Sequence, residues 1–153
     1  MLQWHQWGCC DADRSNEPWL TSALLTVERA LDEIGRHGIA PERVGIVGFS
    51  QGGCLGLEFA ARHARRYRAV AGLSAGLIGP RGTPRAYGGS FAGTPVFLGC
   101  SDVEPHIPLV RVRESADVLR RIGAIVDDRI YRRMGHTVNG DEVEAVKRLF
   151  LEY

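Results

Sequence analysis

The sequence predicts an α/β fold in which a mostly parallel sheet of about four strands carries helices on its faces. Two observations support this prediction. Short apolar runs alternate with longer segments of helical period from residue 17 onward, an order typical of parallel sheets. The apolar run 44–49 ends at Ser50, which stands close to glycines and is followed by a helical pattern. The chain must therefore reverse direction sharply at Ser50.

The N-terminal residues differ in character from the rest of the chain. Residues 1–16 contain two tryptophans and two cysteines and follow neither a helical nor a strand period, so we expect an irregular segment there. From residue 17 the apolar residues recur at helical spacing as far as Ile34, and Gly35 and Gly38 end this predicted helix. A single domain is expected over residues 17–153.

The centre of the predicted fold is a strand over 44–49 and a helix from about Gly52 to Ala64. Gly48 and Gly52 have no Cβ atom, so strand and helix can approach closely around Ser50. Residues 48–52 match the pattern Gly-x-Ser-x-Gly, which holds a serine on a strained strand-to-helix turn. The sequence thus predicts a nucleophile elbow at Ser50, against the alternative of an ordinary serine in a glycine-rich turn.

The remaining segments continue the alternation of strand and helix. A long Gly/Pro-rich connection separates the second and third predicted strands, and it is too long for an ordinary loop. The predicted segments are a strand over 69–73, the connection 74–94, a strand over 95–99, a loop over 100–108, a helix over 109–122, a strand over 124–131, a loop over 132–137 and a helix over 141–152.

Composition limits the functional classes. The 153 residues are 44% hydrophobic, which suits one domain with one core, and 19 basic against 18 acidic residues give no field that would attract nucleic acid or an acidic membrane. The four cysteines show neither zinc-ligand nor disulfide spacing. No signal peptide and no apolar run of about 18 residues is present, so a cytoplasmic protein without a membrane-spanning segment is expected.

Three side chains with complementary chemistry each follow a predicted strand. Ser50, Asp102 and His136 leave the carboxyl ends of three parallel strands, and such ends meet at one edge of a sheet. A serine hydroxyl becomes a strong nucleophile when an imidazole takes its proton, and a carboxylate orients that imidazole. The sequence therefore predicts a Ser50–His136–Asp102 triad.

Alternatives exist for two of the three roles. His106 shares the loop of Asp102 and is the main alternative to His136 as the base. Asp102 is preferred as the acid because it comes first after its strand; the other candidates are Glu104, Asp127 and Asp128. Capping of a loop turn is the structural alternative for Asp102.

Three motifs carry a resemblance to a known family. Gly-Phe-Ser-Gln-Gly-Gly (48–53), Gly-Cys-Ser-Asp (99–102) and Met-Gly-His-Thr-Val (134–138) resemble the phospholipase/carboxylesterase family of α/β-hydrolases, which includes acyl-protein thioesterases. The resemblance implies Ser50 as nucleophile, Asp102 as acid and His136 as base. It also implies hydrolysis of carboxylic esters, lysophospholipids or thioesters through an acyl-enzyme, with no cofactor and no metal. Leu77 and Ile78 would line the acyl or alcohol side of the pocket, unless they simply pack the long connection.

The resemblance also reveals a departure. Family members carry several strands ahead of the elbow strand, and a connection among those strands supplies one N–H of the oxyanion hole. No segment before residue 17 matches them, so we expect an N-terminally truncated fold in which only the N–H of Gln51 can be assigned as an oxyanion donor. Loss of one such donor lowers the rate about 10²- to 10³-fold.

The missing strands would leave the elbow strand at an edge of the sheet. We expect this edge either to pair with a second copy of the chain in a homodimer or to be covered by residues 1–16. Two other functions stay open beside a serine hydrolase acting on a small ester or lipid substrate. One is a weakly active or non-catalytic remnant that serves as an interaction module, and the other is an acyltransferase that uses the same acyl-enzyme.

Overall fold

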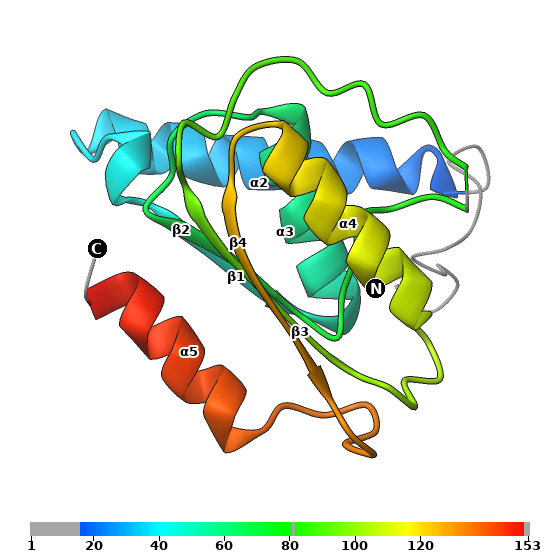
Figure 1. Cartoon of the computed structure of the whole chain (residues 1–153). Coiled ribbons are helices and arrows are strands. Elements are labelled where there is room, and N and C mark those ends of the chain that lie inside the picture. Colours follow the sequence, from blue (N-terminus) through cyan, green and yellow to red (C-terminus); the bar gives the residue numbers. More distant parts are fainter. Residues whose placement is uncertain (1–15, 81, 152–153) are drawn as a thin grey trace, which may run out of the picture.

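A computed structural model describes residues 16–80 and 82–151 of the chain. They form a four-stranded parallel sheet in the order β1-β2-β3-β4, with helices on both faces (Figure 1). The predicted α/β class with about four parallel strands is confirmed. The elements are α2 (Trp19–Arg36), the short 3-10 helix η1 (Pro41–Arg43), β1 (Gly45–Phe49), α3 (Ser50–Arg62), β2 (Ala69–Leu73), β3 (Pro95–Ser101), α4 (Leu109–Arg121), β4 (Ile125–Tyr131) and α5 (Gly140–Leu151).

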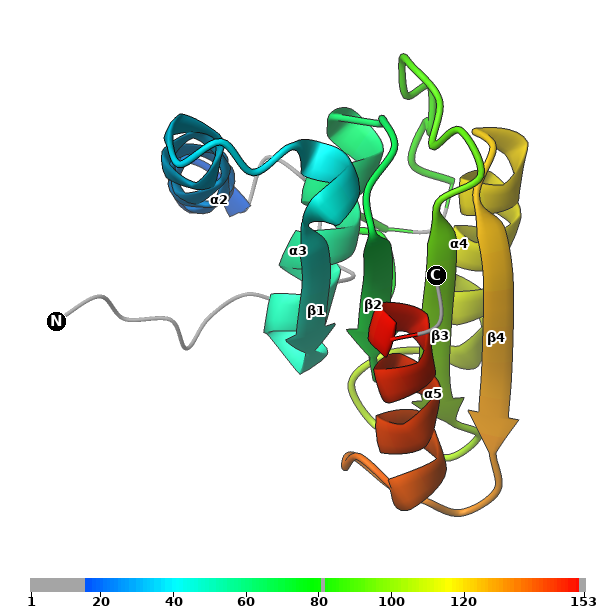
Figure 2. The same cartoon turned by 90° about the vertical axis from the view of Figure 1, so that its left-hand side faces the viewer.

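The sheet divides the core into two parts, each covered by helices. Figure 2 shows α3 and α4 on one face of the sheet and α5 on the other, with α2 packed outside α3. Side chains alternate between these faces along each central strand, as the two-residue period of a strand requires. On β2, Val70 joins the larger core cluster on the α3 and α4 side, whereas Ala69, Ala71 and Leu73 join the smaller cluster with α5.

Strand burial follows the position of each strand in the sheet. Every residue of β2 and β3 is buried, because helices cover both faces of these central strands. β1 and β4 lie at the two edges and are partly exposed. Among the described strands β1 has a neighbour only in β2, which confirms its predicted edge position, and its residues Val47 and Phe49 are 49% and 40% exposed.

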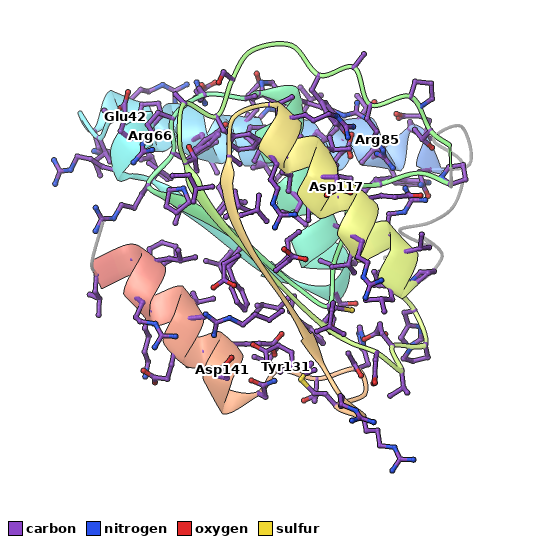
Figure 3. The ribbon with its side chains drawn as sticks, viewed as in Figure 1. Glu42, Arg66, Arg85, Asp117, Tyr131 and Asp141 are labelled. Carbon is purple, nitrogen blue, oxygen red and sulfur yellow. The ribbon has the colours of Figure 1, made fainter. Side chains whose placement is uncertain are left out.

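The loop between β4 and α5 is fixed by hydrogen bonds at the end where α5 begins. The side chain of Asn139 accepts the N–H of Glu142, and Glu142 accepts the N–H of Asn139, both at 2.9 Å, which is a capping box. Tyr131 and Asp141 lie side by side (Figure 3), with the Tyr131 hydroxyl donating to Asp141 at 2.7 Å. Arg129 also donates to Asp141 at 2.8 Å, and together these two donors lower the pKa of Asp141. The start of α5 is thereby tied to the end of β4.

A buried carboxylate fixes the long connection between β2 and β3. Glu58 of α3 accepts the N–H of Ile78 at 3.1 Å, the hydroxyl of Tyr87 at 3.0 Å and the Nε hydrogen of Arg62 at 2.8 Å. Burial and the negative charge of Glu58 raise the pKa of Tyr87 to about 12, so its hydroxyl stays a donor. The described part of this connection contains no helix or strand, and polar contacts of this kind hold it in place.

Part of the sequence-based expectation lies beyond the described residues. Of the irregular segment 1–16, only Asn16 is described, and its side chain is buried. The predicted cover of the sheet edge by this segment therefore stays a prediction. None of the helices within residues 16–80 and 82–151 has the length and hydrophobicity required to cross a membrane.

The free edge of β1 generates a prediction about self-association. We expect this edge to pair with a second chain, because no strand of residues 16–80 and 82–151 pairs with it and Val47 presents apolar surface beside it. Val47→Lys places a charge on the edge and should weaken association at least about tenfold. Sedimentation velocity over a concentration series measures this.

Val143 of α5 provides the matched control. It is 43% exposed, close to the value for Val47, but it lies on α5 and not on the edge strand itself. Val143→Lys should leave the association unchanged. A wild-type chain that stays monomeric at high micromolar concentration contradicts pairing through β1, and so does equal weakening by both substitutions.

Candidate active site

Ser50 occupies a sharp turn between β1 and α3. Its φ is +53°, in the left-handed region that residues other than glycine rarely adopt. A Cβ atom on Gly48 would lie 2.4 Å from the carbonyl carbon of Gly52, and one on Gly53 would lie 2.6 Å from the Cβ of Ala75. The close approach therefore requires glycine at 48 and 53. The predicted requirement at Gly52 is wrong, because a Cβ there would meet nothing within 4 Å.

The α3 helix also begins earlier than expected. Its first residue is Ser50 itself, two residues before the predicted start at Gly52. The backbone N–H groups of the first helical turn have no acceptor within the helix. Gln51 lies in this turn, so its N–H belongs to the set that can bind an anionic oxygen.

His136 lies in the loop between β4 and α5, next to the Ser50 turn. Its ring centroid is 4.8 Å from that of Phe49, the residue before Ser50, with the rings inclined at 41°. Its side chain is 24% exposed. Within residues 16–80 and 82–151, the Ser50 hydroxyl makes no hydrogen bond, an arrangement common in active sites before substrate binds. The structure thus brings the turn and the imidazole side by side.

The carboxylate that contacts His136 belongs to Glu104. Its two oxygens lie 2.8 and 2.9 Å from Nδ1 of His136, and the side chain is completely buried. The backbone N–H of His106 donates to the same carboxylate at 2.9 Å. Burial alone would raise the pKa of Glu104, but the hydrogen bonds from His106 and His136 outweigh it and leave this pKa lowered. A charged acceptor at Nδ1 favours the tautomer with hydrogen on Nδ1 and a free lone pair on Nε2.

Asp102 occupies a different place from the one predicted. Its carboxylate accepts the backbone N–H of Arg133 at 2.7 Å, and its own N–H donates to the carbonyl of Tyr131 at 3.0 Å. The structure describes no hydrogen bond between Asp102 and His136. The short Asp102 side chain is used to hold the next loop, whereas Glu104, two residues further on, folds back to reach the imidazole.

The Ser101 hydroxyl joins the two loops that carry Glu104 and His136. Ser101 Oγ accepts the N–H of Gly135 at 3.1 Å and that of Val103 at 3.2 Å. The Ser74 hydroxyl, at the end of β2, is fully buried and has no hydrogen-bond partner among the described residues; its proximity makes the smallest contribution to the lowered pKa of Glu104. Sequence reasoning missed Ser74; its signal was a hydroxyl directly after the apolar strand 69–73.

The two residues expected to line the substrate pocket are core residues here. Leu77 is completely buried and Ile78 is 7% exposed, and both belong to the larger core cluster. The N–H of Leu77 donates to Ser115 Oγ at 2.8 Å, which fixes this part of the connection against α4. The structure therefore gives Leu77 and Ile78 a packing role, and their contact with substrate stays a prediction.

Two other reactive side chains, the thiol of Cys100 and the imidazole of His106, lie near the site. Burial, together with the charge of Glu104, raises the pKa of the Cys100 thiol to about 12, so this cysteine stays protonated. His106, the alternative base, is exposed, and its ring lies 4.7 Å from that of His136 at 72°. Its backbone, not its ring, holds Glu104.

Comparison with known proteins places these features in context. A family model described as phospholipase/carboxylesterase matches residues 1–153. The chain is 30% identical over 119 residues to acyl-protein thioesterase 1 of Gibberella zeae, covering 72% of this chain and 48% of that protein. It is 28% identical over 125 residues to acyl-protein thioesterase 1 of Saccharomyces cerevisiae, covering 80% of this chain and 55% of that protein. The chain thus spans about half the length of these curated relatives.

A solved structure resembles the fold closely. The crystal structure of a phospholipase/carboxylesterase from Dyadobacter fermentans superposes with a TM-score of 0.92 at 37% sequence identity. The match covers 97% of this chain and 71% of that one. The architecture described here is therefore shared by a longer protein.

The Glu104–His136 contact predicts a pH-dependent loss of stability. Because the pKa of Glu104 is lowered on folding, its stabilisation is fully present above the ordinary glutamate pKa of about 4.3 and is lost as the pH falls through the lower folded value. Glu104→Gln should lower the free energy of unfolding by about 1.5–3 kcal/mol at pH 7. The difference from wild type should shrink toward pH 3. Urea unfolding at both pH values measures it.

Asp102→Asn is the control for this prediction. Asparagine keeps an oxygen that can accept the N–H of Arg133, so its effect at pH 7 should be much smaller than that of Glu104→Gln. A loss from Glu104→Gln that stays constant between pH 7 and pH 3 would count against a charged Glu104.

Proposed function

Because the chain belongs to the phospholipase/carboxylesterase family, we propose that it is a serine hydrolase that cleaves carboxylic esters or thioesters through an acyl-enzyme on Ser50. One observation carries the proposal: the buried Glu104 carboxylate contacts His136 beside the strained turn that presents Ser50. The name acyl-protein thioesterase 1, carried by two relatives, supports including thioesters in the substrate class.

In the proposed first step His136 acts as the general base. Glu104 accepts the hydrogen on Nδ1, which leaves Nε2 free to take the proton of Ser50 as its oxygen attacks the acyl carbonyl carbon. The imidazolium that forms is stabilised by the buried carboxylate. Glu104 thus takes the role first predicted for Asp102, and Asp102 holds the His136 loop through Arg133.

Collapse of the tetrahedral intermediate completes acylation. The imidazolium gives its proton to the departing alkoxide or thiolate as the C–O or C–S bond breaks, and the acyl group remains on Ser50 as an ester. A water molecule then attacks this ester while His136 accepts its proton. The carboxylic acid leaves, and Ser50 recovers its hydrogen from His136.

The N–H of Gln51 is proposed to stabilise the oxyanion in both steps. It lies in the first turn of α3, where backbone N–H groups lack helical acceptors and the helix dipole favours negative charge. No second donor is assigned within the described residues. A site with one donor should be slower by about 10²- to 10³-fold than a site with two.

Covalent labelling tests the proposal directly. A fluorophosphonate probe should form an adduct that mass spectrometry locates at Ser50. Ser50→Ala should abolish the adduct, and His136→Ala should lower the labelling rate by at least about 10³-fold because the base is lost. Absence of labelling in a folded sample would overturn the hydrolase proposal and favour an interaction module that uses the exposed edge of β1.

A matched pair of variants separates the two carboxylates. Glu104→Gln keeps the shape of the side chain but removes its charge, and it should lower kcat/KM for p-nitrophenyl esters about 10²- to 10⁴-fold. Asp102→Asn keeps an acceptor for Arg133 and should have a much smaller effect. The reverse order would restore Asp102 as the catalytic acid.

A further inference from the structure

Three metal-binding side chains gather at one corner of the site. We propose that Glu104, His106 and His136 bind a divalent ion of the zinc type, which blocks the site when it is bound. The ligand atoms of these three residues all lie within 4.8 Å of one another. Binding of the ion depends only on this cluster, whereas its effect on turnover rests on the proposed function.

The cluster is close to the geometry that a zinc ion requires. Zinc binds imidazole nitrogen and carboxylate oxygen at about 2.0–2.2 Å in a tetrahedron, which places neighbouring ligand atoms about 3.3 Å apart. Glu104 and His136 are already closer than this, at 2.8 Å. The His106 nitrogen, which lies within 4.8 Å of the other two ligand atoms, must approach them to complete the set. Its exposed side chain is free to rotate toward the other two.

Charge and access both favour a cation. The Glu104 side chain is completely buried, and it offers a carboxylate oxygen within 4.8 Å of a ring nitrogen of each histidine. The exposed ring of His106 stands edge-on to that of His136, at the solvent side of the cluster. An ion can therefore meet His106 first and then reach Glu104 and His136.

The ligand types select among ions. Two imidazoles and one carboxylate suit zinc, copper and nickel, whereas magnesium and calcium prefer sites built only from oxygen atoms. Three protein ligands also leave the fourth position of a zinc ion to solvent. The cluster should therefore discriminate strongly between Zn²⁺ and Mg²⁺.

Occupancy by an ion is incompatible with the proposed role of His136. If the ion binds Nδ1, the hydrogen of the neutral ring moves to Nε2, which then cannot accept a proton. If the ion binds Nε2, the required lone pair is already used. In either case the ion also draws the Glu104 carboxylate away from its contact with the ring. Zinc should consequently act as a reversible inhibitor.

Titration of the full chain with ZnCl₂ in a calorimeter tests the site. We expect one ion to bind per chain, His106→Gln to weaken binding at least about tenfold, and MgCl₂ to give no binding. His37→Gln is the matched control, because His37 lies 3.3 Å from Glu33 in a two-residue pair and should not contribute. A variant with Cys9→Ser and Cys10→Ser controls for thiolate ligands and should bind as the wild type does.

Each outcome decides the proposal. The site is supported if His106→Gln weakens Zn²⁺ binding and the His37→Gln and cysteine variants do not. The proposal is overturned if Zn²⁺ does not bind, or if wild type and His106→Gln bind it equally. It is also overturned if the variant with Cys9→Ser and Cys10→Ser no longer binds Zn²⁺. If the wild type hydrolyses esters, Zn²⁺ should inhibit it, EDTA should restore the rate, and His106→Gln should need at least about tenfold more Zn²⁺ for half-inhibition of its own rate. Binding by an inactive chain would uphold the metal site and refute the hydrolase.

Discussion

The close approach of α3 to β1 is the constraint on which the site depends. Gly48 and the first turn of α3 are in contact at distances that no Cβ atom would allow, and Gly53 meets Ala75 in the same way. Ser50 is held between these contacts at φ +53°, a conformation that costs about 1–3 kcal/mol for a residue other than glycine. The largely buried α3 helix supplies the packing that maintains this strain. The position of the serine is therefore a consequence of core packing.

A second constraint joins the loops after β3 and β4. Ser101 and Asp102 accept backbone N–H groups from Gly135 and Arg133, so the two loops are held together just before His136 in the chain. Glu104 then reaches His136 from a loop whose position is already fixed. The two acidic residues have different roles: Asp102 holds the backbone of the next loop, and Glu104 places a buried carboxylate against His136. This division explains how a site can keep two carboxylates close together without having them compete for one histidine.

Much of the fold could be predicted from the sequence. The alternation of strands and helices and the sharp turn at Ser50 follow from apolar periodicity and glycine placement, and the structure confirms them. The edge position of β1 followed from the family resemblance, and it holds among the described strands. The choice between Asp102 and Glu104 could not be made in this way. Both residues leave the same strand end, and the outcome depends on side-chain reach and on the N–H of Arg133, which belongs to another loop.

Long-range contacts also explain why Leu77 and Ile78, expected to line the substrate pocket, are buried in the core. Leu77 and Ile78 lie in a connection without secondary structure, where sequence period gives no indication of which side chains are buried. Their burial depends on Glu58 and Ser115, which accept their N–H groups from α3 and α4. A glutamate inside an otherwise apolar helix was the available signal, because such a residue requires buried partners.

Phe49 links the exposed edge of the sheet to the chemistry of the site. It is 40% exposed on β1, and its ring packs 4.8 Å from that of His136. A chain that pairs with β1 would extend the sheet beside Phe49 and exclude water near the imidazole. Electrostatic interactions strengthen when water is removed, so the Glu104–His136 pair would then be held more tightly. Through the Phe49 ring, pairing at the free edge of β1 would therefore act on the proposed active site.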